Sequence, residues 1–63
     1  MKILNKLSVA GKMLLTLDDD ILSINPSKVI VDGKEFDFDI AFDMKNTIGI
    51  EVDSVKGDTV TFI

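Results

Sequence analysis

The sequence predicts a small all-β protein, and three observations support this fold class. Asp32-Gly33 separates an apolar run at residues 29–31 from a segment in which Phe or Ile occupies every second position from 36 to 42. An Asp-Gly pair between such runs is a strong signal for a β-hairpin, since both residues of its two-residue turn need positive φ. Apolar residues alternate again over residues 47–52, and Gly11 interrupts the apolar N-terminal segment.

The expected architecture follows from these hairpins. We expect one domain, residues 1–63, folded as a small antiparallel barrel or a two-layer sandwich of about five to six strands built from consecutive hairpins. The alternative is an α+β fold, in which an N-terminal helix covers a four-stranded sheet.

The alternative arises because the apolar residues among positions 1–17 fit both the period of a helix and the period of a strand. They include a helical series and a series of odd-numbered positions that suits two strands. Gly11 favours strands, since it would cost a helix about 1 kcal/mol relative to Ala and stands where a turn is needed. With a loop at 10–12, Val9 lies opposite Met13 and Leu7 opposite Leu15.

The chain between the N-terminal unit and the central hairpin is short. Three adjacent carboxylates at 18–20 end the first unit, because they repel one another inside a ladder. Residues 21–24 form an apolar link, and Asn25-Pro26-Ser27 is a typical turn sequence.

Two more hairpins are expected after residue 36. A loop at 43–47 would pair Ile40 with Ile50, and a three-residue loop at 55–57 with Gly57 in the left-handed region would pair Ile50 with Phe62. The apolar surface that results is the predicted core, covered by the N-terminal unit. It comprises Val29, Phe36, Phe38, Ile40, Phe42, Ile48, Ile50, Val52, Val60 and Phe62.

The same registers place acidic residues on the other face, with Asp39 opposite Glu51 and Asp37 opposite Asp53. Like charges directly opposite each other are destabilising, so either a cation covers them or the strands pair differently. The spacing of these acids does not match an EF-hand loop. We therefore expect a solvated acidic face, with no metal site and no cofactor.

The composition argues against several function classes. The chain has no Cys and no His, so it lacks disulfides, thiolate ligands and the commonest general base. Asp37 and Asp39 would lie roughly 7 Å apart, a spacing that suggests a catalytic pair of carboxylates. Any half-exposed strand produces that spacing, however, so it is not evidence for catalysis. We expect a protein that is not an enzyme. A net charge of −4 argues against nucleic acid and anionic membranes as partners.

The N-terminal apolar run is too interrupted for a signal peptide or a membrane span, because Asn5, Lys6, Ser8 and Lys12 divide it. A cytoplasmic location is the expectation that follows.

Small size without disulfide or metal favours self-association as a source of stability. We expect a non-enzymatic protein interaction module that forms a homodimer through the uncharged edge of the final strand, residues 59–63, and through exposed apolar residues. The candidates for that contact are Ile30, Val55 and Ile63. The alternative is an acidic inhibitor or regulator that covers a basic, nucleic-acid-binding surface of a partner protein, with Asp37, Asp39, Glu51 and Asp53 as its contacts.

Overall fold

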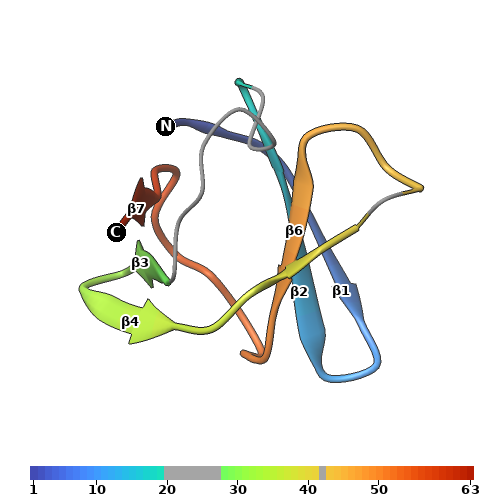
Figure 1. Cartoon of the computed structure of the whole chain (residues 1–63). Helices are drawn as coiled ribbons and strands as arrows, with labels where there is room; N and C mark the ends of the chain where they lie inside the picture. The colour runs from blue at the N-terminus through green and yellow to red at the C-terminus, as the bar shows by residue number, and fades with distance from the viewer. Residues whose placement is uncertain (20–27, 42) are drawn as a thin grey trace.

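The computed structural model describes residues 1–19, 28–41 and 43–63, and every regular element in them is a β-strand. Two antiparallel sheets face each other (Figure 1). One has the order β1-β2-β6-β5, formed by Ile3–Val9, Lys12–Leu17, Thr47–Ile50 and Asp39–Ile40. The other has the order β4-β3-β7, formed by Lys34–Phe36, Val29–Val31 and Thr61–Phe62. The all-β prediction is confirmed, and the alternative with an N-terminal helix is wrong.

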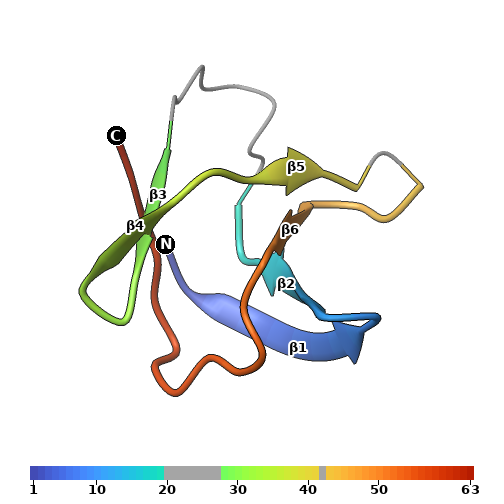
Figure 2. The same ribbon diagram turned by 90° about the horizontal axis from the view of Figure 1, so that it is seen from below.

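The two sheets meet at both borders without closing into a barrel. On one side the chain runs directly from β4 into β5, and on the other the start of β1 lies beside the C-terminal segment (Figure 2). Lys2 forms an isolated bridge with Thr59, and the Val60 N–H donates to the Met1 carbonyl oxygen at 2.9 Å. These contacts hold the two layers together at their edges.

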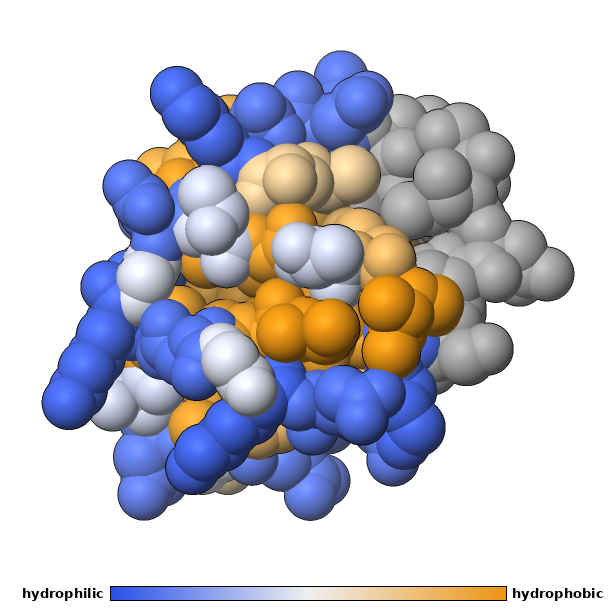
Figure 3. All heavy atoms as spheres, turned by 90° about the vertical axis from the view of Figure 1, so that its left-hand side faces the viewer, coloured by the Kyte–Doolittle hydropathy of each residue, from blue (hydrophilic) through white to orange (hydrophobic). Residues whose placement is uncertain are grey.

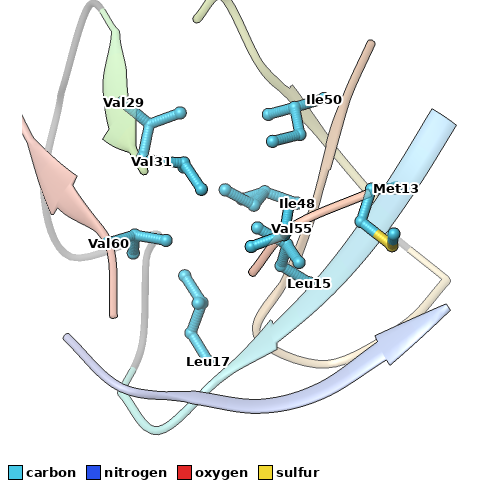
Figure 4. Close-up of a cluster of buried hydrophobic side chains, with 9 residues drawn as sticks. All are labelled: Met13, Leu15, Leu17, Val29, Val31, Ile48, Ile50, Val55 and Val60. Atoms are coloured by element: carbon cyan, nitrogen blue, oxygen red, sulfur yellow. The ribbon is translucent and has the colours of Figure 1, made fainter. Parts of the chain in front are cut away.

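The core between the sheets is aliphatic (Figure 4). Its buried side chains are Met13, Leu15, Leu17, Val29, Val31, Ile48, Ile50, Val55 and Val60. Phe36, Phe38 and Phe62 are only half-buried at its border, so the predicted core centred on phenylalanine is wrong in this respect. Phe36 and Phe62 lie on β4 and β7, the border strands of the three-stranded sheet, and Phe38 lies between β4 and β5.

The N-terminal segment forms two strands, as predicted, but their register differs from the prediction. Ala10 and Gly11, with φ of 51° and 81°, form a two-residue turn, so Val9 pairs with Lys12 and Leu7 with Leu14. Two adjacent residues of positive φ are typical of a type I′ turn. A slip of one residue moves a whole strand face from one side of a sheet to the other. Leu7 and Val9 consequently face outward.

The hairpin around Asp32-Gly33 is confirmed, with φ of 52° and 77° at its two turn residues. Val29 pairs with Phe36, and Ile30 with Glu35, in the predicted register.

The pairing of β5 with β6 differs from the prediction by two residues. Ile40 lies opposite Ile48, not Ile50, and Asp39 lies opposite Gly49. The loop also ends one residue earlier than expected, because Asn46 adopts a positive φ of 53° as its last residue and β-branched Thr47 starts the strand. Asn tolerates that conformation far better than Thr. A slip of two residues leaves each side chain on its predicted face.

The predicted third hairpin does not form. After Ile50 the chain crosses to the other sheet, where β7 pairs with β3 and places Phe62 opposite Val29. The Asp32 carboxylate fixes this crossing by accepting hydrogen bonds from the N–H groups of Lys56 and Gly57, each at 2.8 Å. Gly57 has no positive φ. A side chain there would meet Asp32, since a Cβ would lie 2.8 Å from its Oδ1.

Some predictions concern parts of the chain outside the described residues. These are Asp20, the apolar link at 21–24, the turn at 25–27 and the burial of Phe42.

Candidate functional site

The most exposed apolar surface in the described residues lies on the outward side of the β1–β2 hairpin. Leu4, Leu7 and Val9 are 65%, 47% and 45% exposed, and Leu14 beside Leu7 is half-buried. Leu4 sits at a register irregularity between Ile3 and Asn5, which leaves it without an opposite residue on β2. We call Leu7, Val9 and Leu14 the outer apolar face.

This face continues onto the next strand through Leu14. A Cβ placed on Gly49 of β6 would lie 3.2 Å from Leu14 Cδ2, so the leucine side chain lies over the glycine. The register places Leu7, Leu14, Gly49 and Asp39 in one row across β1, β2, β6 and β5. The Leu14 side chain therefore extends the outer apolar face over β6, and this row ends at the acidic residue Asp39.

The first half of the β1 edge is covered by the segment 55–59. The contacts, in antiparallel order, join Lys2 to Thr59, the Ile3 N–H to the Asp58 carbonyl oxygen at 2.8 Å, and Lys6 Nζ to the Val55 carbonyl oxygen at 2.8 Å. Beyond Lys6, residues 7–9 pair with β2 on one side and with no strand on the other among the described residues. We call residues 7–9 the free edge of β1.

The free edge carries no charge to protect it. Natural edge strands are often protected by a lysine, which discourages pairing with another chain. Lys6 could have this role, but its ammonium group is turned toward the Val55 carbonyl oxygen. Leu7, Ser8 and Val9 remain as a neutral, β-compatible stretch at the border of the sheet.

The acidic residues are arranged differently from the prediction. Because Asp39 lies opposite Gly49, the expected opposition to Glu51 does not occur, and no strand pairing joins Asp37 to Asp53 in the described residues. Asp39 Oδ2 accepts from Lys12 Nζ at 2.9 Å, and Asp37 Oδ1 lies 3.1 Å from Lys28 Nζ. The hydrogen bond to Asp39, together with the charge of that carboxylate, raises the pKa of Lys12. Both pairs are solvent-exposed, so they contribute little to stability.

Three of the four predicted acidic residues surround one open hollow of about 440 Å³. Its acidic residues are Glu35, Asp37, Asp39 and Glu51, and Phe36, Phe38, Lys28 and Gly49 complete the lining. Asp53 is exposed and does not line this hollow. Over residues 1–19, 28–41 and 43–63, no group of three or more His, Cys, Asp or Glu side chains is placed to hold a metal ion.

The three predicted apolar contacts lie in different surroundings. Ile63 is 52% exposed at the end of the chain, and Ile30 is half-buried on the outward side of β3. Val55 is only 7% exposed, so its expected surface position is wrong. The hairpin loop predicted to expose it does not form, and the crossing chain instead places Val55 in the core. Figure 3 shows the side that carries β3, β4 and β7, where apolar atoms cross the middle of the surface and hydrophilic atoms surround them.

The edge expected at the final strand is shorter than predicted. β7 comprises only Thr61–Phe62, and Ile63 exchanges backbone hydrogen bonds with Lys28. Val60 is bonded to Met1. On the side of β7 away from β3, the contacts of Thr59 with Lys2 and of Val60 with Met1 occupy the first part of the 59–63 segment.

A second open hollow, of about 570 Å³, lies beside the β3–β4 turn and includes Asp32, Ser54 and Val55. Hydrogen bonds from the backbone N–H of Lys56 and then of Gly57 lower the pKa of Asp32. A carboxylate held in this way is a weak base, so it is poorly suited to activate the Ser54 hydroxyl.

The predicted register assigned Leu7 and Val9 to the same face as Met13 and Leu15, which is the interior. The signal that could have revealed the outer apolar face is the Ala10-Gly11 pair. A two-residue turn at this pair sets the register that directs Leu7 and Val9 outward.

Comparisons with protein families, with characterised proteins and with solved structures give no match to this chain. In the part of the chain that the structure describes, no helix is long and apolar enough to cross a membrane.

Proposed function

We propose that this protein is a non-enzymatic interaction module that self-associates as a dimer through a sheet edge and exposed apolar residues. The observation that carries the proposal is the outer apolar face next to the free edge of β1. Exposed apolar residues are common singly, but a contiguous set on one sheet face is typical of an interaction surface. The proposed edge is that of β1 and not that of the final strand.

The size of the chain supports self-association. Domains of about 60 residues bury a smaller fraction of their surface than larger domains do and have marginal stability without disulfides or metals. This chain has no Cys, and its described core has nine buried apolar side chains. A second copy paired at the free edge of β1 would add apolar contact between Leu7 and Val9 of the two copies. A free edge of three residues makes a small interface, so we expect a weak, concentration-dependent dimer.

Sedimentation equilibrium over a range of chain concentrations tests the proposal. The mass should rise from one chain toward two, and Leu7→Lys should hold the mass at one chain because it places a charge in the apolar contact. Ile63→Lys is the matched control, since Ile63 is similarly exposed but lies on the other sheet. A single-chain mass at all concentrations contradicts the proposal. Loss of the dimer in Ile63→Lys alone would assign the contact to the β7 side.

The acidic hollow supports a second candidate function, an acidic regulator that covers a basic surface of a partner protein. Glu35, Asp37, Asp39 and Glu51 line one concave surface, and such an arrangement complements a convex basic group. We rank it second because Lys28 and Lys12 already pair with Asp37 and Asp39.

Affinity capture from a native cell lysate at low and high salt tests this second function. A genuine partner should bind at low salt, be released at high salt, and be lost with the double variant Asp37→Asn/Asp39→Asn. Asp53→Asn is the control, because Asp53 lies outside the hollow. Capture that is unchanged in the double variant would contradict the acidic surface as the site.

A further inference from the structure

We infer the register of the self-association: two copies pair in antiparallel orientation along the free edge of β1, with Ser8 opposite Ser8 of the second copy and Leu7 opposite Val9. The inference rests on the proposed function, and it adds the geometry of the contact. A two-fold axis would pass between the two Ser8 residues, and the two four-stranded sheets would become one continuous sheet.

The covered half of β1 limits the choice of register. Segment 55–59 bonds to the backbone at Lys2 and Ile3 and accepts a hydrogen bond from the Lys6 side chain, so residues 7–9 are the part of β1 with neither contact. An antiparallel pairing centred on Leu7 would need Asn5, which lies at the register irregularity between Ile3 and Asn5 and next to the bound Lys6. A pairing centred on Val9 would need Gly11, which belongs to the turn and has a φ of 81°. The pairing centred on Ser8 uses only the free edge.

The position of the apolar side chains favours the same register. Residues directly opposite each other in a ladder share a face of the sheet. Leu7 and Val9 both point outward, so pairing them keeps the outer apolar faces of both copies on one side. A register that placed Leu7 opposite Ser8 would turn these faces to opposite sides. In the Ser8-centred register Leu7 of each copy packs beside Val9 of the other, a contact that the shifted register would remove.

The backbone of Ser8 is oriented for this pairing. In a two-residue turn the flanking residues, here Val9 and Lys12, direct their N–H and C=O groups at each other. Hydrogen-bonding direction alternates along a strand, so the N–H and C=O of Ser8 point away from β2, toward the free edge. Two Ser8 residues related by a two-fold axis can therefore exchange a pair of N–H···O bonds.

The side chains across the junction are compatible in size and charge. Each outward row would run from Leu14 through Leu7 to Val9 of the second copy, and the two-fold axis repeats it. Lys6 would lie opposite Ala10, so no two lysines face each other. Lys12, which follows Val9 in the row, is already bound to Asp39.

Disulfide trapping tests the register. The chain has no Cys, so every disulfide reports an introduced pair. Leu7→Cys and Val9→Cys chains, mixed and oxidised, should give the mixed disulfide as the main product, because opposite residues that do not exchange hydrogen bonds have close Cβ atoms. Each variant alone should give little, since its two copies would be diagonal neighbours about 7–8 Å apart. Ile63→Cys serves as an exposed control.

The outcomes separate the register from the self-association. Efficient cross-linking of Leu7→Cys with itself would overturn the Ser8-centred register. Absence of the mixed disulfide in a sample that sediments as a dimer would also overturn it, while self-association would stand. A native chain that sediments as a monomer would remove the proposed function as well. A measurement without substitutions is amide hydrogen exchange: exchange at Ser8 should slow as the chain concentration rises, and unchanged exchange at Ser8 in a dimeric sample would contradict the inference.

Discussion

The two hairpins with positive-φ turns, β1–β2 and β3–β4, have the same local geometry and very different surroundings. At the β3–β4 turn, Asp32 holds the N–H groups of Lys56 and Gly57, which ties the hairpin to the crossing segment. At the β1–β2 turn, Ala10 has no side-chain donor or acceptor, and a Cβ on Gly11 would meet nothing within 4 Å. The β3–β4 hairpin is hydrogen-bonded to the rest of the fold at its turn, whereas the β1–β2 hairpin has an apolar outward face and no such contact at its turn among the described residues.

The difference shows that a turn residue can stabilise its own turn and can also fix the position of a segment far away in the sequence. Asp32 supplies the positive φ that the turn needs and also a carboxylate that decides where residues 56–57 lie. Ala10 supplies only the backbone conformation, which an L-residue other than Asn, Asp or Gly adopts at a cost. The β1–β2 hairpin therefore depends on its inward face for stability, and its outward face is available for binding.

Adjacent leucines on β2 should show the largest contrast. Leu15 is fully buried, and Leu15→Ala should lower the free energy of unfolding by about 2–5 kcal/mol through lost contacts and a cavity. Leu14 points outward and is half-buried, so Leu14→Ala should cost less than about 1.5 kcal/mol. Urea unfolding at low chain concentration measures both. Equal costs would contradict the assignment of the inward and outward faces.

The two turns should respond in a matched way to an added Cβ. Gly11→Ala and Gly33→Ala each place Ala at positive φ with no atom within 4 Å of the new Cβ, so each should cost about 1 kcal/mol in unfolding free energy. Ala10→Asn should have the opposite sign and stabilise by up to about 1 kcal/mol, because Asn tolerates φ near 51°. Thermal unfolding of the three variants checks this. A destabilising Ala10→Asn would show that the turn is not the type I′ form.

The Asp32 contact should give the β3–β4 hairpin a pH dependence that the β1–β2 turn lacks. Backbone hydrogen bonds lower the pKa of Asp32 in the folded chain, so the carboxylate stabilises the fold above its unfolded pKa of about 3.9. That stabilisation is lost as the pH falls through the folded pKa. Asp32→Asn should lower the melting temperature at neutral pH by less than Leu15→Ala does, and its difference from the native chain should shrink in acid. A difference that stays constant from pH 7 to pH 2 would contradict the role of the carboxylate.

The parts of the fold that the sequence could predict are those with a local signal. Asp32-Gly33 predicted its hairpin and register, and the period-two alternation predicted strands on both sides of it. Positions 7 and 9 were assigned to the wrong face because the sequence around Gly11 is compatible with both a three-residue loop and a two-residue turn. The wrong third hairpin has a different cause: Lys56-Gly57 has the composition of a turn, but its N–H groups bind Asp32, a residue 24 or more positions earlier.

The candidate site shows the same limit. The free edge of β1 depends on where residues 55–59 run, and only the contacts of Lys2, Ile3 and Lys6 reveal that course. Part of the acidic hollow could be predicted from the sequence, because alternation alone places Asp37 and Asp39 on one side of their segment. Glu35 was not named as a site residue, although the same alternation places it on the side of Asp37 and Asp39.

The most direct test of the claim that a second copy binds the β1–β2 hairpin is an isotope-filtered NMR measurement on the unmodified chain. Carbon-13-labelled and unlabelled chains are mixed, and only contacts between different chains are recorded. The methyl groups of Leu7 should show such contacts with those of Val9, growing with concentration. Contacts that involve Ile63 in place of Leu7 and Val9, or none at all at the highest soluble concentration, would contradict it.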